Sequence, residues 1–146
     1  MLLSQKLVDL IERNADELTR KWLENLEKHP ATSTYRKLDQ KKLYDYTFDI
    51  YREVGKWISK ETTKEDIARY YIPLGRFRRK EGIPLSEVVQ ALIIMRRLIW
   101  IKVLEEGALD TALDLHQAMN LNNRVVVFFD RAIYYTIKGY EGAEKG

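Results

Sequence analysis

The chain has 146 residues, with 25 lysines and arginines against 22 aspartates and glutamates, for a formal net charge of +3. This length favours one domain with its own hydrophobic core, and so small a charge excess gives no indication of a nucleic-acid partner. The absence of cysteine excludes disulfides, iron–sulfur ligation and thiolate catalysis. It is also typical of the reducing cytoplasm, where we expect the protein to work.

Apolar residues recur at helical spacing along the chain, and two helices are predicted in the first sixty residues. The first covers about 4–28, where Ser4 can cap it and Pro30 follows it. Its charges begin in the first turns, which excludes a secretory signal. The second covers about 40–59 behind a capping Asp39, and the HPATSTYRKLD segment between the two is expected to be a loop.

A third helix is predicted over about 63–81, with Thr62 and Glu65 at capping-box spacing. Pro73 lies inside its apolar pattern. Because proline lacks an amide hydrogen and crowds the preceding turn, we expect a kink near residues 70–75. The basic run RFRRK at the end of the helix complements the helix dipole, and an electrostatic docking patch is the alternative reading.

The fourth helix, about 84–105, contains the most apolar stretch of the chain. Arg96, Arg97 and Lys102 interrupt this stretch. Since a charge near a bilayer centre costs about 2.5–3.5 kcal/mol on insertion scales, we expect no membrane insertion. On a helical wheel Arg97 faces water, whereas Arg96 lies in line with Trp100. Arg96 therefore needs a carboxylate, a route to solvent, an anionic ligand or a subunit interface.

The last helix is predicted over about 109–140, and its apolar seam contains an asparagine, Asn122. A seam asparagine can fix the register of two paired helices, which favours a contact between subunits. The residues that we expect to form this dimer face and to carry a signal are Met119, Asn122, Val126, Phe129 and Ile133.

Five helices joined by short loops predict an all-α fold, a single bundle that is either antiparallel or globin-like without haem. Periodicity does not separate these arrangements, because it does not encode crossing angles. Tyr70 and Tyr71 stand beside the expected kink. Aromatic residues at helical spacing are mostly core residues. The alternative is a small ligand pocket between the third and fourth helices, lined by Tyr70, Tyr71, Arg96 and Trp100.

No pattern of residues indicates a metal site or a catalytic site. The two histidines are His29 and His116, and no Glu-x-x-His occurs. Too few helical residues follow His116 for the haem arrangement of a globin. There is neither a Gly-x-Ser-x-Gly elbow nor a phosphate-binding glycine loop. We expect no metal, no cofactor and no enzymatic activity; a small helical enzyme is the least supported alternative.

The segment LGRFRRKEGIPLSEVVQALIIMRRLIWIKVL, residues 74–104, resembles the signature region of the RsbRD-type N-terminal domains of bacterial RsbT co-antagonist proteins. The matching features are the arginine-rich helix end, the Glu-Gly-Ile that follows it, and the two arginines ahead of Ile99 and Trp100. The first helix around Trp22 and the closing FFDRAIYYTIKGYE also resemble the family, so the similarity covers nearly the whole chain.

This resemblance implies a non-enzymatic input domain of bacterial stress signalling, placed ahead of a STAS, kinase or other output module. Related domains adopt a haem-free globin-like fold and pair as dimers, so the resemblance also implies a homodimer and a downstream signalling partner. The last helix would carry the signal to the output module. A small-ligand-binding module is the alternative function. Whether the chain is a piece of a longer protein stays open.

Overall fold

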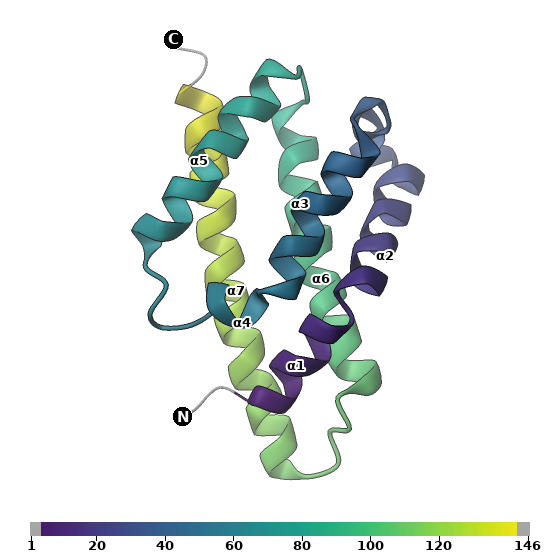
Figure 1. Cartoon of the computed structure of the whole chain (residues 1–146), viewed down its shortest axis with the longest axis vertical. Helices are drawn as coiled ribbons and strands as arrows, with labels where there is room; N and C mark the ends of the chain where they lie inside the picture. The colour runs from purple at the N-terminus through teal and green to yellow at the C-terminus, as the bar shows by residue number, and fades with distance from the viewer. Residues whose placement is uncertain (1–3, 143–146) are drawn as a thin grey trace.

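A computed structural model describes residues 4–142, and all the regular structure in that range is helical (Figure 1). The all-α prediction is therefore confirmed, but the prediction of about five helices is wrong, because there are eight helical segments in this range. They are α1 (Gln5–Arg13), α2 (Ala15–Lys28), the 3-10 helix η1 (Pro30–Lys37), α3 (Gln40–Arg52), α4 (Val54–Trp57), α5 (Lys64–Lys80), α6 (Leu85–Glu106) and α7 (Ala112–Gly142).

Each of the first two predicted helices is two helices in the structure, α1 and α2, and α3 and α4. At each break a side chain takes the place of a backbone hydrogen-bond partner. At Asn14 the side-chain Nδ2 donates to the Leu10 carbonyl at 2.7 Å, while the Asn14 amide donates to Ile11, only three residues back. Such side-chain competition ends α1. At the α3–α4 junction the amide of Gly55 donates to the Glu12 carboxylate at 3.1 Å instead of continuing the helical pattern.

Two helices begin later than predicted, and in both a threonine provides the cap. The capping box of α5 joins Thr63 and Asp66, one residue later than the Thr62 and Glu65 expected from sequence. Thr111 and Asp114 exchange the same pair of hydrogen bonds, so that α7 begins at Ala112 and not at residue 109. The helix α5 runs without a break through Pro73.

The helices α5 and α7 run in the same direction, and α6 runs antiparallel to both (Figure 1). The contact between α5 and α7 is centred on two glycines. A Cβ atom on Gly75 would lie 1.9 Å from the Thr136 carbonyl oxygen, and one on Gly139 would lie 2.0 Å from that of Ile72. The two backbones therefore touch directly, which any larger residue at either position would prevent.

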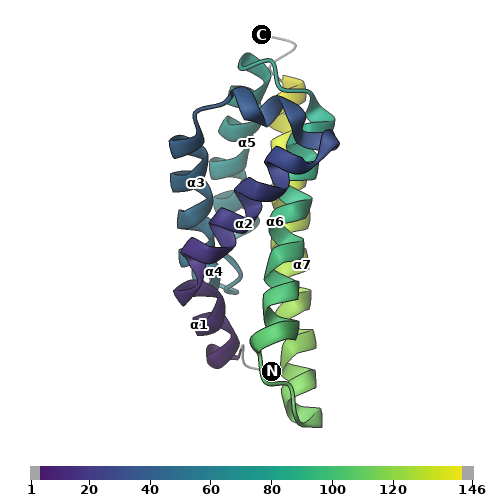
Figure 2. The ribbon, with the colours of Figure 1, turned by 90° about the vertical axis from the view of Figure 1, so that its right-hand side faces the viewer.

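The most apolar helix, α6, lies in the core. Figure 2 shows α6 and α7 together on one side of the molecule, with α1 and α3 on the other. The Trp22 indole nitrogen of α2 donates to the Ala91 carbonyl, and the Tyr51 hydroxyl of α3 donates to the Met95 carbonyl, both at 2.9 Å. Neighbours on several sides therefore explain its apolar composition. None of the helices between residues 4 and 142 is long and apolar enough to cross a membrane.

Candidate functional site

The long helix α7 has one fully buried stripe and one stripe of mostly apolar residues that is partly exposed. The buried stripe comprises Ala118, Leu121, Val125, Phe128, Phe129, Ala132, Thr136, Gly139 and Tyr140. Of the predicted dimer residues, Phe129 belongs to this stripe and is 0% exposed. Met119 is 60% exposed, and Asn122, Val126 and Ile133 are half-buried. The structure thus places four of the five predicted residues at the surface and one in the core.

An ion pair on the outer side of α6 and α7 accounts for Arg96. Its Nη1 lies 3.6 Å from Oδ1 of Asp130, and both side chains are partly exposed, at 32% and 64%. A carboxylate from another helix was one of the partners expected for this arginine. The pair shows which parts of the two antiparallel helices lie opposite each other, so residues one and two turns away on each helix face the same side.

We call the surface around this pair the outer α6–α7 face. Its apolar members are at least partly exposed although they sit at helical spacing, and two of them, Leu104 and Met119, are more than half exposed. The face consists of Ile93, Arg96, Trp100 and Leu104 on α6, and of Met119, Asn122, Val126, Asp130 and Ile133 on α7. Partly exposed apolar side chains at matching positions of two neighbouring helices make this face a candidate interaction site.

The tyrosines predicted to line a ligand pocket belong to an aromatic cluster elsewhere in the fold. The rings of Tyr70 and Tyr71 are 4.9 Å apart, and Tyr71 contacts Phe128 of α7 at 5.9 Å between centroids. Burial raises the pKa of Tyr70 to about 12 and raises that of Tyr71 further. The hydroxyls of Tyr71 and of Tyr46, whose ring stacks on Tyr70, are buried next to each other and have no hydrogen bond of good geometry to any other group.

The structure does not bring the four predicted pocket residues together. Tyr70 and Tyr71 lie with Phe128, whereas Arg96 lies with Asp130 and Trp100 lies one turn beyond it on the outer face. Phe128 and Asp130 are two residues apart on α7 and so point in directions about 200° apart. The two tyrosines and the pair of Arg96 and Trp100 are therefore on different sides of α7.

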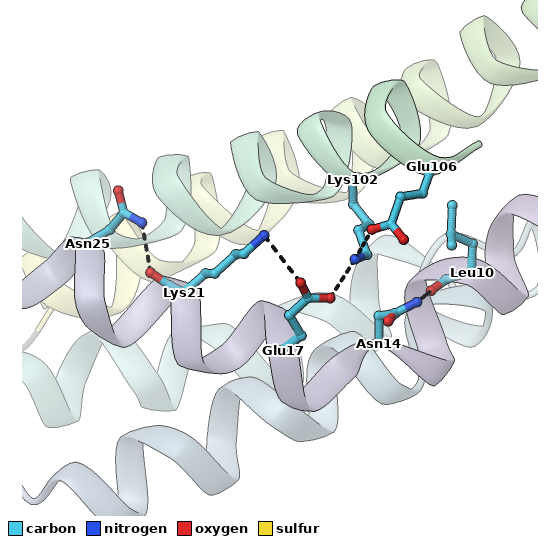
Figure 3. Close-up of polar contacts among 7 residues, drawn as sticks. All are labelled: Leu10, Asn14, Glu17, Lys21, Asn25, Lys102 and Glu106. Carbon is cyan, nitrogen blue, oxygen red and sulfur yellow. Dashed lines mark hydrogen bonds and ion pairs between the residues drawn. The ribbon is translucent and has the colours of Figure 1, made fainter. Parts of the chain in front are cut away.

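A buried lysine that sequence reasoning passed over joins α6 to α2 (Figure 3). The Lys102 side chain is only 3% exposed, and its Nζ donates to Glu17 at 2.5 Å and to the Glu106 carboxylate. Lys21 approaches the other oxygen of Glu17 at 3.4 Å. The hydrogen bond from Lys102 lowers the pKa of Glu17. Burial opposes the charge on Lys102, but the two carboxylates outweigh it and raise its pKa, so Lys102 is a charged structural group.

The basic run at the end of α5 contains a second buried cation. Arg78 is 7% exposed, pairs with Glu81 at 2.6 Å and lies over the ring of Tyr35. Nearby, the Glu87 carboxylate accepts hydrogen bonds from the amide and the hydroxyl of Thr34 in η1. Arg78 thus fills a structural position at the α5–α6 turn, which the reading of the run as a uniform patch did not foresee.

The end of α7 is held at the same turn. The Tyr140 hydroxyl donates to the Ile83 carbonyl at 2.7 Å, and the Arg79 guanidinium lies 5.1 Å from the centre of the Tyr140 ring. The last described turns of α7 are therefore attached to the segment that joins α5 and α6. Between residues 4 and 142 no group of histidine or carboxylate side chains is placed to hold a metal ion.

Residues 16–145 match the model of the family described as the RsbT co-antagonist protein rsbRD N-terminal domain. The match covers most of the chain and includes every residue of the outer α6–α7 face. The family is one of regulatory signalling domains and not of enzymes. No curated protein and no solved structure matches the chain.

Proposed function

The chain belongs to the family of RsbRD N-terminal domains, and we propose that it is a single helical input domain that transmits a signal through α7 to a C-terminal output module of STAS or kinase type. The family match over residues 16–145 carries this proposal. The 31 residues of α7 support it, because a helix of that length extends over about 46 Å and can connect distant parts of a protein.

We propose further that two copies of the chain pair through the outer α6–α7 face. Its half-exposed apolar side chains would be covered by the same surface of a second copy, as in a two-fold symmetric interface. Asn122 lies in the N-terminal half of the α7 part of this face, next to Val126, and an asparagine in such a position can set the register of paired helices. Phe129 is not part of the proposed interface, since it is buried within its own chain.

A signal would then act on α7 from both sides. Its inner stripe rests on α5 through the glycine contact, and its outer stripe would rest on the partner copy. Packed helices respond to a ligand or a partner by small sliding and rotation. A shift of α7 against α5 would therefore change the geometry of the dimer and, with it, the position of the output module. The stress-response role is the one the family suggests.

Sedimentation velocity tests the pairing. Val126→Glu places a charge in the proposed interface and should raise the dimer dissociation constant by at least about tenfold, because an unpaired buried charge opposes association. The control is Leu113→Glu, on the same helix. Leu113 is 60% exposed and lies about 180° around α7 from Asn122. An unchanged monomer–dimer equilibrium for the Val126 variant would count against the interface.

A small-ligand-binding module remains the second candidate function. The placement of Tyr70, Tyr71, Arg96 and Trp100 on two sides of α7 gives no support to the ligand position expected from the sequence. A different cavity favours ligand binding, and it lies against another side of the same helix.

A further inference from the structure

A cavity of about 290 Å³ lies where the segment between α4 and α5 passes beside the middle of α7 (Figure 1). Four residues of α7 line it, Arg124, Val127, Phe128 and Arg131, at the spacing of a single helical stripe. Trp57 and Lys60 line it from the opposite side. This stripe differs from the one that forms the outer α6–α7 face, so the cavity stays open in the proposed dimer.

The charges around the cavity are all positive. Lys60, Arg124 and Arg131 line the cavity, and none of the described residues that line it is acidic. Within residues 4–142 neither Lys60 nor Arg131 has an ion-pair partner, and both are exposed. Glu61 and Asp66 line a neighbouring hollow that shares Trp57, Ser59 and Thr62 with the cavity, but they do not line the cavity itself. An anion in the cavity would therefore contact cations and no lining carboxylate.

Arg124 has a defined position in this arrangement. Its Nη2 donates to the Ile58 carbonyl at 2.7 Å, which attaches the segment after α4 to α7. A guanidinium has five donor hydrogens, so this bond leaves others for a ligand. The cationic rim is thus partly pre-formed, which reduces the entropy lost when a ligand binds.

Trp57 and Val127 form the accessible apolar part of the cavity wall. Trp57 is partly exposed and Val127 is 39% exposed, whereas Phe128, whose ring lies 5.5 Å from that of Trp57, is 2% exposed and supports the wall from the core. Ligand sites typically combine such an apolar lining with a few polar groups, in volumes of about 300–1,000 Å³. This cavity is at the small end of that range. Its size and composition suit a single ring or a short chain that carries one anionic group.

We propose that this cavity binds a small organic anion, a carboxylate or a phosphate monoester with a flat apolar body. The anionic group lies between Lys60 and Arg131, and the apolar body lies against Trp57 and Val127. Arginine donors suit the oxygens of either anionic group. Such a ligand would join the α4–α5 segment to α7. The binding itself does not depend on the proposed signalling function or on the dimer.

Isothermal titration calorimetry of the purified chain at low salt tests the proposal. The probes are benzoate and phenyl phosphate, with benzyl alcohol as the neutral analogue and inorganic phosphate as the anion without a ring. We expect at least one aromatic anion to bind about tenfold more tightly than benzyl alcohol and inorganic phosphate, as expected when a charged hydrogen bond and ring burial act together. The comparison of the two aromatic probes identifies the preferred anionic group.

Variants connect the binding to the cavity. Lys60→Gln and Arg131→Gln should each weaken the better probe about tenfold, because each removes one charge-assisted hydrogen bond. Arg76→Gln, which removes an exposed arginine outside the cavity, should leave the affinity unchanged. All three replacements are at exposed side chains, and circular dichroism with a melting curve checks the fold.

Three results would overturn the proposal. One is the absence of binding by both aromatic anions at about 10 mM, where even affinities near −3 kcal/mol are detectable. Another is equal binding of benzyl alcohol, and the third is unchanged affinity in both cation variants. Amide chemical shifts of the unaltered chain give a check that needs no variant. With the better probe they should change in residues 57–62 and 124–131, and changes confined to other residues would contradict the proposed site.

Discussion

Gly75 of α5 and Thr136 of α7 are in such close contact that a Cβ atom on the glycine would lie 1.9 Å from the threonine carbonyl oxygen. In the same way, a Cβ atom on Gly139 of α7 would lie 2.0 Å from the carbonyl oxygen of Ile72 of α5. Because the obstacle is backbone and not a movable side chain, the helices would have to separate to accept even one methyl group. This contact sets the position of α7 in the fold.

Gly75→Ala should therefore lower the free energy of unfolding by about 3 kcal/mol, the upper part of the range for overpacked cores. Urea denaturation measures the loss. The matched control is Gly142→Ala, because a Cβ atom there has no neighbour within 4 Å, and it should change stability by less than about 1 kcal/mol. A Gly75 variant as stable as the unaltered protein would show that the helices do not touch as described.

The hydroxyls of two fully buried tyrosines, Tyr51 and Tyr71, should contribute differently to stability. The Tyr71 hydroxyl has only the neighbouring Tyr46 hydroxyl as a partner and no hydrogen bond of good geometry, so Tyr71→Phe should change the free energy of unfolding by less than about 0.5 kcal/mol. The Tyr51 hydroxyl donates to the Met95 carbonyl, so Tyr51→Phe should cost about 1 kcal/mol. Urea denaturation of the two variants side by side decides, and destabilisation of equal size in both would contradict the distinction.

The ion pairs of Lys102 predict a dependence of stability on pH. Hydrogen bonding to Lys102 lowers the pKa of Glu17 below its usual value of 4.5, so the unfolded chain binds a proton more readily than the folded one. The resulting stabilisation is present above about pH 4.5 and is lost as the pH falls through the lowered pKa. Acidification should therefore weaken the link between α2 and α6.

Lys102→Met tests this link, because it keeps an apolar side chain of similar length in the buried position. At pH 7 the change should be within about 1 kcal/mol, since the variant removes the one buried charge, and the carboxylates of Glu17 and Glu106, which are 44% and 50% exposed, can be hydrated instead. Between pH 6 and pH 3.5 the melting temperature of the variant should fall less than that of the unaltered protein. Parallel curves for the two proteins would mean that Glu17 does not depend on Lys102.

Sequence periodicity predicted the long helices well, because burial of a stripe leaves a direct trace in the order of residues. It did not predict the breaks at Asn14 and Glu53. Each break depends on a side chain that takes the place of a backbone hydrogen-bond partner. The Asn14 side chain donates to the Leu10 carbonyl, and the Glu12 carboxylate, which belongs to α1, accepts from the Gly55 amide. Burial costs predicted that Arg96 needs a carboxylate, a route to solvent, an anionic ligand or an interface, but they could not identify Asp130 without the packing of α6 on α7.

The same limit applies to the candidate sites. Gly75 and Gly139 are 64 residues apart in the sequence, and Lys102 is 85 residues from Glu17. Neither the glycine contact nor the ion pair can therefore be recognised from a pattern of neighbouring residues. The predicted dimer face included Phe129, which is buried in the core. Helical spacing alone did not show this, because Phe129 lies at the border between the outer stripe and the buried stripe of α7. The choice between an antiparallel bundle and a globin-like arrangement stays a prediction.

The proposed pairing of two chains through α7 is tested most directly by a single introduced thiol, which the absence of natural cysteine makes unambiguous. In Asn122→Cys the two copies should bring their thiols within disulfide distance, with Cα atoms about 4.4–6.8 Å apart. Mild oxidation should then convert most of the chain into a covalent dimer on a non-reducing gel, while Leu113→Cys should stay monomeric. Equal cross-linking of the two variants, or none at position 122, would contradict the account.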